Sequence, residues 1–305
     1  MMKLFLSKIF LFFCLVFLVD TLCGAVFSSI NKVNESEKSD NYIMMKVNQD
    51  ILIFGSSRAN RHYDTRVLSD SLQMSCFNCG QSGQGFIHNY ILLDAIMSRY
   101  IPKLIIYDVY PPMDFYEGDN IRYIKSFRPY RENKEINNIL QQIDMSEKYK
   151  VFSKMYCFND ICNNILFDYL AFIPKEKSIN GFIPTRQEMN FALLKRNYDK
   201  SYVTDSIKLL YAKKFIELSK KTKVVLVMSP TWYGYNEHYE EQSKMLAKAL
   251  DVPFIDFTAN TKYKYNSQFF FDGVHLNEKG AESFSKDLIR KIKDDFSSKR
   301  SDLTN

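Results

Sequence analysis

Glycine and proline are scarce in this chain, at 10 and 8 of its 305 residues. This scarcity excludes a collagen-like or low-complexity protein, and a composition that is 46% hydrophobic and 15% aromatic can bury a substantial core. The length favours one large domain or at most two. The net charge of +6 is spread along the chain, so no cationic patch indicates a nucleic-acid partner.

Histidine is rare as well. The four histidines, His62, His88, His238 and His275, are scattered through the sequence and form no ligand cluster. We therefore expect no metal centre and no other cofactor.

Two close cysteine pairs need an explanation, Cys76 with Cys79 and Cys157 with Cys162. No histidine accompanies either pair, and the second spacing fits a structural zinc site poorly. Buried thiols, or one disulfide across the fold, are the favoured interpretation.

The N-terminal segment is strongly apolar, with eleven unbroken apolar residues from Ile9 to Val19. As a helix, residues 9–27 span about 28 Å, close to the hydrocarbon thickness of about 30 Å. Lys3 and Lys8 precede the run, so residues 1–8 should stay in the cytoplasm and the rest should be exported. We predict a single-pass anchor in inner-membrane lipid, with an extracytoplasmic main domain that is periplasmic if the cell has two membranes.

A cleavable signal peptide ending near Cys23-Gly24-Ala25 is the alternative, and a lipoprotein signal fits less well because Leu22 is bulky. Asp20 interrupts the apolar segment in its outer half, where interfacial exposure or protonation lowers the cost of the carboxyl. In every case the body is exported. Residues 28–48 are predicted to form a polar linker.

The exported body, residues 49–298, alternates strand and helix patterns. Short apolar runs predict strands at 50–54, 74–78, 103–108, 223–228 and 252–257, and helical spacing is found at 89–100, 205–222, 237–250 and 278–296, the last capped by Asn277. This alternation predicts an α/β fold with a parallel sheet covered on both faces. Residues 115–200 lack the alternation and are interpreted as a mostly helical insertion that shapes or covers a site.

Three loops carry candidate chemistry. Gly55-Ser56-Ser57-Arg58 follows the first strand, Asn78-Cys79-Gly80-Gln81-Ser82-Gly83 follows the second, and Asp272-Gly273-Val274-His275 precedes the last helix. Alone, each has an ordinary explanation as a helix cap, a tight turn or a chance pairing. Together they place a serine, a glycine-rich turn and an Asp–His pair, in that order, at ends of elements where parallel sheets gather their chemistry.

This combination resembles the SGNH (GDSL-type) hydrolase superfamily. The resemblance implies a three-layer αβα sandwich with a five-stranded, flavodoxin-like parallel sheet. It implies that Ser57 is the nucleophile, His275 the general base and Asp272 its orienting carboxylate. The amides of Ser57 and Gly83 would bind the oxyanion, and Ser56 stands where the family has an aspartate.

One block departs from the family pattern. The family's third motif, Gly-x-Asn-Asp, supplies an asparagine amide to the oxyanion hole, but the corresponding stretch, 107–111, holds no asparagine. Arg58, His62 and Asn120 are candidate substitutes for this donor. Arg58 and Asp108 are also expected to contact substrate.

The favoured function is an extracytoplasmic serine esterase acting on cell-envelope or glycan esters. A looser resemblance, resting on the Gly-Ser-Ser form and the topology, is to the membrane-anchored branch that includes D-alanine transfer and alginate O-acetylation proteins. Two alternatives therefore stay open. One is an O-acyltransferase of a surface polysaccharide that uses the same serine, and the other is a non-catalytic accessory that binds a glycan or a membrane acyltransferase.

Overall fold

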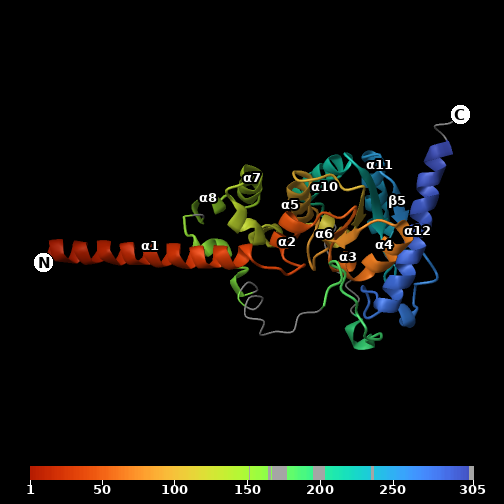
Figure 1. The fold of residues 1–305 in the computed structure, drawn as a ribbon, viewed down its shortest axis with the longest axis horizontal. Helices are drawn as coiled ribbons and strands as arrows, with labels where there is room; N and C mark the ends of the chain where they lie inside the picture. The colour runs from red at the N-terminus through yellow and green to blue at the C-terminus, as the bar shows by residue number, and fades with distance from the viewer. Residues whose placement is uncertain (151, 164–165, 167–176, 195–202, 235–236, 302–305) are drawn as a thin grey trace. The chain divides into compact units, whose positions relative to one another are not determined.

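The computed structural model describes residues 1–150, 152–163, 166, 177–194, 203–234 and 237–301 (Figure 1). The chain forms two compact units. The first unit comprises residues 1–42 and 119–175, and the second comprises residues 43–118 and 176–305.

The second unit contains a five-stranded sheet. Its elements, with α2 at the division between the units, are α2 (Asp40–Lys46), β1 (Ile51–Gly55), α3 (Ser57–His62), α4 (Thr65–Leu72), β2 (Cys76–Asn78), α5 (Phe86–Met97), β3 (Leu104–Asp108), α6 (Pro111–Asp114), η4 (Phe191–Leu193), α10 (Ser206–Ser219), β4 (Lys223–Met228), α11 (Glu237–Ala249), β5 (Phe254–Asp256), η5 (Ser267–Phe269) and α12 (Glu278–Ser301).

The sheet is parallel throughout, in the order β2-β1-β3-β4-β5. This is the flavodoxin-like order, and it confirms the predicted α/β fold. Each predicted strand has its counterpart within a few residues, and β4 has the predicted bounds. The Asn277 cap is confirmed too, because its side-chain oxygen accepts the amide of Gly280 at 2.9 Å.

Helices cover both faces of the sheet (Figure 1). On one face α12 packs with α3 and α4, and the buried Phe284 of α12 belongs to the core built on β1, β3 and β4. On the other face α5 packs with α10, where Phe86 stacks on Tyr107 of β3 with ring centroids 3.9 Å apart. Burial on both faces explains the unbroken apolar runs of the central strands.

The carboxyl ends of the strands share one edge, because the strands are parallel. Gly55, the last residue of β1, pairs with Asp108, the last residue of β3. A Cβ at position 55 would lie 2.8 Å from the Asp108 carbonyl oxygen, and the φ of Gly55 is +137°. Glycine is therefore required where β1 turns toward Ser57.

The first unit is built around α1 (Met2–Lys32), a helix long and apolar enough to cross a membrane. Its other described elements are η1 (Asn120–Tyr123), η2 (Lys125–Tyr130), α7 (Lys134–Ile143), α8 (Glu147–Lys150) and η3 (Met155–Phe158). The helix extends beyond the predicted segment 9–27 at both ends. The linker predicted for 28–48 is therefore wrong in part, since α1 continues to Lys32 and α2 follows.

Residues 153–158 pack against the second half of α1. Asp20 accepts hydrogen bonds from the Ser153 hydroxyl and from the amides of Lys154, at 2.7 Å, and Met155, at 3.2 Å. The rings of Phe27 and Phe158 stack at 5.9 Å. The insertion predicted for 115–200 is thus helical in part and supports α1, although its segments 164–165, 167–176 and 195–202 lie outside the described residues.

All six cysteines lie among the described residues and are free thiols. Cys76, Cys79 and Cys157 are buried. The sequence offered buried thiols or one disulfide across the fold, and the structure agrees with the thiols.

Candidate active site

Ser57, His275 and Asp272 form one hydrogen-bonded series in the second unit. The Ser57 Oγ lies 2.8 Å from His275 Nε2, and His275 Nδ1 lies 2.8 Å from Asp272 Oδ2. The serine and the histidine are 218 positions apart in the chain. The sheet topology brings the two loops together.

Asp272 determines the tautomer of His275. A carboxylate only accepts hydrogen bonds, so Nδ1 carries the ring proton and Nε2 is left to accept the Ser57 hydroxyl. Burial alone would raise the pKa of Asp272. Hydrogen bonds from the His275 ring and from the amides of Val274 and His275 outweigh burial and hold that pKa below its ordinary value. The carboxylate is therefore ionised at neutral pH.

The loop that carries His275 is fixed from several sides. The Gly273 carbonyl accepts the Trp232 amide at 3.1 Å, and the Phe271 carbonyl accepts the Asn190 amide at 2.8 Å. Backbone hydrogen bonds of this kind allow little displacement of the imidazole.

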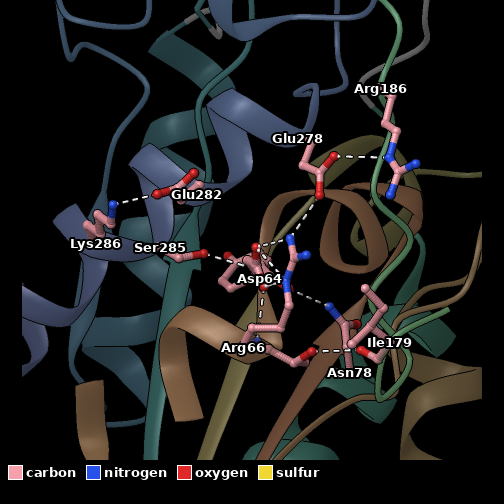
Figure 2. A network of polar contacts seen from close by, with 11 residues as sticks. Asp64, Arg66, Asn78, Ile179, Arg186, Glu278, Glu282, Ser285 and Lys286 are labelled. Carbon is pink, nitrogen blue, oxygen red and sulfur yellow. Dashed lines mark hydrogen bonds and ion pairs between the residues drawn. The ribbon is translucent and has the colours of Figure 1, made fainter. Parts of the chain in front are cut away.

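Ion pairs tie the start of α12, just after this loop, to the α3–α4 turn (Figure 2). Arg66 contacts the Asp64 carboxylate at 2.6 Å and the Glu278 carboxylate at 3.0 Å. Arg186 contacts Glu278 from the other side at 3.3 Å. The elements bearing Ser57 and His275 are thus joined outside the triad as well as within it.

Ser57 is the first residue of α3, directly after the tight turn of β1. The side chain of Ser56 caps this helix by accepting the Arg58 amide at 3.4 Å. Ser56 thus has the ordinary capping role, while the next serine faces the imidazole.

The glycine-rich turn after β2 is attached to α3 through Asn78. The Asn78 amide nitrogen donates to the Ala59 carbonyl at 2.7 Å, and its oxygen accepts the Gly80 amide at 3.0 Å. The turn also reaches β1, because the Gln81 amide donates to the Gly55 carbonyl at 3.1 Å. The segment that holds Gly83 is therefore anchored to the strand and helix on either side of Ser57.

Arg58 and Asp108 have a different place from the one expected. Their side chains are 1% and 0% exposed, and their guanidinium and carboxylate lie 3.4 Å apart. Arg58 also donates to the Ser229 carbonyl at 2.7 Å, and Asp108 accepts the Tyr63 hydroxyl at 2.8 Å. The substrate contact predicted for them does not match this burial, since groups that are shielded from solvent and bonded to one another have little access to a ligand.

His62 completes this buried cluster. Its Nε2 accepts the Leu276 amide at 3.1 Å, so its proton is on Nδ1, which lies 2.8 Å from Ser229 Oγ. Burial, with the nearby charge of Arg58 adding to it, holds the pKa of His62 well below 6.5. The ring is neutral at neutral pH. As the Nε2 lone pair serves Leu276, His62 is not a donor for an oxyanion. Arg58 Nη2 is held by Ser229 and Asp108.

Ser229 is the member that the sequence did not single out. It follows β4, where Ser229-Pro230 reads only as the end of a strand. A polar residue at the carboxyl end of a central parallel strand is the signal that could have indicated it. Asn120, the remaining candidate oxyanion donor, belongs to the first unit.

Tyr110 stands beside this cluster, two residues after β3. The Arg58 guanidinium carbon lies 5.3 Å from the centre of its ring. Burial raises the pKa of Tyr110, Arg58 opposes the rise, and the Asp272 carboxylate adds to it. The phenol therefore keeps its proton across the ordinary pH range and lies within electrostatic reach of Asp272.

A hollow of about 660 Å³ opens beside the start of α12. Most of the residues that line it are polar, and Met189 and Phe191 are apolar. Arg186, Gln268 and Glu278 are among its polar residues.

Comparisons with known proteins give structural neighbours only, because no family model and no curated protein matches this sequence. A GDSL-like lipase from Bacteroides thetaiotaomicron is 12% identical, with 79% of this chain and 88% of that chain covered and a TM-score of 0.37. An acetyl-xylooligosaccharide esterase from Geobacillus is 11% identical, with 81% and 96% covered and a TM-score of 0.37. An acetyl xylan esterase is 13% identical, with 79% and 99% covered and a TM-score of 0.35. Similarity this low carries no argument about function, which has to be argued from the site.

Proposed function

We propose that this protein is a membrane-anchored serine esterase that hydrolyses acyl esters of cell-envelope glycans. The observation that carries the proposal is the pair of 2.8 Å contacts that link Ser57 to His275 and His275 to Asp272. An alcohol, an imidazole and a carboxylate in series are the parts of a serine-hydrolase triad. The resemblance of the three loops to the SGNH hydrolases supports the same function.

In the proposed mechanism, the Ser57 oxygen attacks the ester carbonyl while His275 Nε2 takes the hydroxyl proton. The imidazolium then gives this proton to the departing alcohol, which leaves an acyl-serine. A water molecule attacks the acyl-serine as His275 removes a proton from it, and the imidazolium then gives this proton to the Ser57 oxygen as the acid is released. Asp272 stays ionised and stabilises the imidazolium in both halves.

The oxyanion needs hydrogen-bond donors. The amides of Ser57 and Gly83 are two of them, and the phenol of Tyr110 is our candidate for the third, in place of the missing asparagine. Because Gly55 pairs with Asp108, Ser57 and Tyr110 each stand two residues beyond a matched pair on adjacent strands. A tyrosine hydroxyl is an established kind of donor for such sites.

The hollow beside α12 supports a glycan as the substrate. A lining of charged and amide side chains with a neighbouring aromatic ring suits a sugar better than it suits a long acyl chain, because sugars combine many hydroxyls with apolar ring faces. Ser57, Asp272 and His275 are not among the residues that line the hollow, so it supports the binding of a glycan chain beside the start of α12 and not the position of the reacting ester.

We also propose that α1 remains attached as the membrane anchor, with the second unit extracytoplasmic. Lys3 and Lys8 precede the apolar run, as the positive-inside rule requires. Cleavage near Cys23-Gly24-Ala25 would remove Asp20, whose carboxylate accepts three hydrogen bonds from residues 153–155. These contacts support retention of the helix that carries Asp20.

The test is an esterase assay on the full chain in detergent micelles, with short acyl esters and acetylated oligosaccharides. Ser57→Ala and His275→Ala should each lower kcat/KM by about 10³-fold or more. Ser98→Ala and His238→Ala, at exposed positions, are the matched controls. A fluorophosphonate should label the parent and not Ser57→Ala. If Ser57→Ala and His275→Ala are as active as the parent, the assignment is wrong.

A further inference from the structure

Residues 144–150 and 152–155 of the first unit, the described part of the segment 144–155, present large apolar side chains to solvent. Met145 is 72% exposed, Tyr149 65%, Phe152 78% and Met155 46%. Lys148 and Lys154 are exposed in the same segment. The segment therefore exposes both apolar and lysine side chains, which the core of the unit does not cover.

The position of this segment along α1 is fixed by Asp20. The amides of Lys154 and Met155 and the hydroxyl of Ser153 all donate to the Asp20 carboxylate. Asp20 directly follows the last residue of the unbroken apolar run, Val19. Asp20 at the outer end requires a span that begins earlier than the predicted 9–27. Residues 2–19 measure about 27 Å as a helix, nearly the thickness of the hydrocarbon layer, and Lys3 and Lys8 can extend their amines to the inner headgroups. The segment 144–155 therefore lies at the level where α1 leaves the membrane.

We infer that the segment 144–155 is a second membrane contact, which inserts its apolar side chains into the lipid interface beside the anchor. This inference rests on the proposal that α1 is retained. Figure 1 shows α8, the helix within this segment, on the side of its unit nearest the N-terminal half of α1. Tyrosine is enriched at the membrane–water boundary, and phenylalanine is common on the apolar face of interfacial helices.

Charge supports an anionic lipid surface. Glu147 is buried and its carboxylate pairs with Arg128 at 2.7 Å, while the half-buried Asp144 pairs with Lys150 at 2.7 Å. The acids of the segment are thus neutralised within the unit, and Lys148 and Lys154 are left to face the lipid phosphates. Long lysine side chains can keep their stems in the apolar layer and their amines among the headgroups.

The contact needs little affinity of its own. Because α1 already holds the unit at the bilayer, insertion of the segment is an intramolecular step at high effective concentration. Two points of attachment also restrict rotation of the unit about the helix axis, which a single helix leaves free.

The test uses the full chain in vesicles of phosphatidylcholine and phosphatidylglycerol, with the single tryptophan replaced as Trp232→Phe. Phe152→Trp then reports on the segment, Phe12→Trp on the membrane span, and Ser29→Trp on a helix position about 13 Å beyond Asp20. We expect lipids with brominated acyl chains to quench the Phe152→Trp variant at least half as strongly as the Phe12→Trp variant. Aqueous iodide should quench it severalfold less than the Ser29→Trp variant.

If the Phe152→Trp variant responds like the Ser29→Trp variant, the segment does not enter the interface and the inference is wrong. If the purified chain lacks its first residues by mass spectrometry, the anchor proposal itself has failed, which is a distinguishable result. Lys148→Glu should reduce the bromolipid quenching of the Phe152→Trp variant in vesicles containing phosphatidylglycerol and leave it unchanged in pure phosphatidylcholine. Equal quenching of the Lys148→Glu form and its parent in both lipids would contradict the role of charge.

Discussion

His62 Nε2 accepts the backbone amide of Leu276 at 3.1 Å, so a neutral histidine in the helix of Ser57 holds the residue next to His275. The other ring nitrogen, Nδ1, reaches Ser229 at the end of β4. Protonation of Nε2 would remove the acceptor for Leu276. The position of the candidate base therefore depends on a second imidazole that has no part in the proton transfers.

This relationship predicts a pH-dependent stability. The pKa of His62 is held well below 6.5 in the folded state, so the unfolded chain binds more protons below that pH. The contribution of His62 to stability is complete above about pH 6.5 and is lost as the pH falls, at up to about 1.4 kcal/mol per pH unit. In urea unfolding of the full chain between about pH 8 and 5, His62→Gln should lose this slope. The exposed control His238→Gln should keep it, and equal slopes for His62→Gln and the parent would refute the assignment.

Asp272→Asn should lower kcat by about 10⁴-fold, because an amide can hold His275 in the wrong tautomer. The depressed pKa of Asp272 keeps this carboxylate ionised at neutral pH. The acid limb of kcat/KM in the parent should therefore not include a proton taken up by Asp272. The control is Asp251→Asn, at an exposed position. A Asp272→Asn variant with normal kcat, or an acid limb that needs two protons, would count against the triad.

Tyr110→Phe should lower kcat by about 10²–10³-fold with little change in KM, because an oxyanion donor acts in the transition state. The matched control is Tyr265→Phe, which removes a hydroxyl from an exposed ring. The thermal stability of Tyr110→Phe should stay near that of the parent, which separates loss of a donor from loss of packing. Unchanged kcat would remove Tyr110 from the mechanism and leave the triad intact.

Gly24→Val should loosen the first unit, because even a Cβ at this position would lie 2.5 Å from the Lys154 Cβ. Overpacking of this kind costs about 1–3 kcal/mol. Trypsin should cut the variant after Lys148 or Lys154 about tenfold faster than it cuts the parent, a ratio that corresponds to about 1.4 kcal/mol. Leu22→Val, on the exposed side of the same helix, should leave the cutting rate unchanged. Equal rates for Gly24→Val would mean that α1 does not support residues 153–155.

The strands and their edge could be predicted from sequence because their signals are local. A run such as that of β4 shows its bounds directly, and the parallel order places the residues after β1 and β2 at one edge. The loop motifs then indicated Ser57, Asp272 and His275 as partners. Their contacts follow from the topology of the parallel sheet, which the alternation of strands and helices already predicted.

Contacts over long distances in the chain were beyond the reach of such signals. Arg58 looks like an exposed cation because nothing near it in sequence can neutralise it. Its partners Asp108 and Ser229 are 50 and 171 positions away. The polar residues after Phe27 look like a linker for a similar reason, since Asn31 donates to the Tyr130 hydroxyl, which is 99 positions away.

The continuity of α1 has a practical consequence for making a water-soluble form of this protein. A truncation after the predicted linker would discard residues 20–32 and expose the surface of η3 that they cover. A protein that starts at Asp20 lacks the unbroken apolar run that ends at Val19. It keeps the helical turns that contact residues 153–158, so Asp20 is the better first residue.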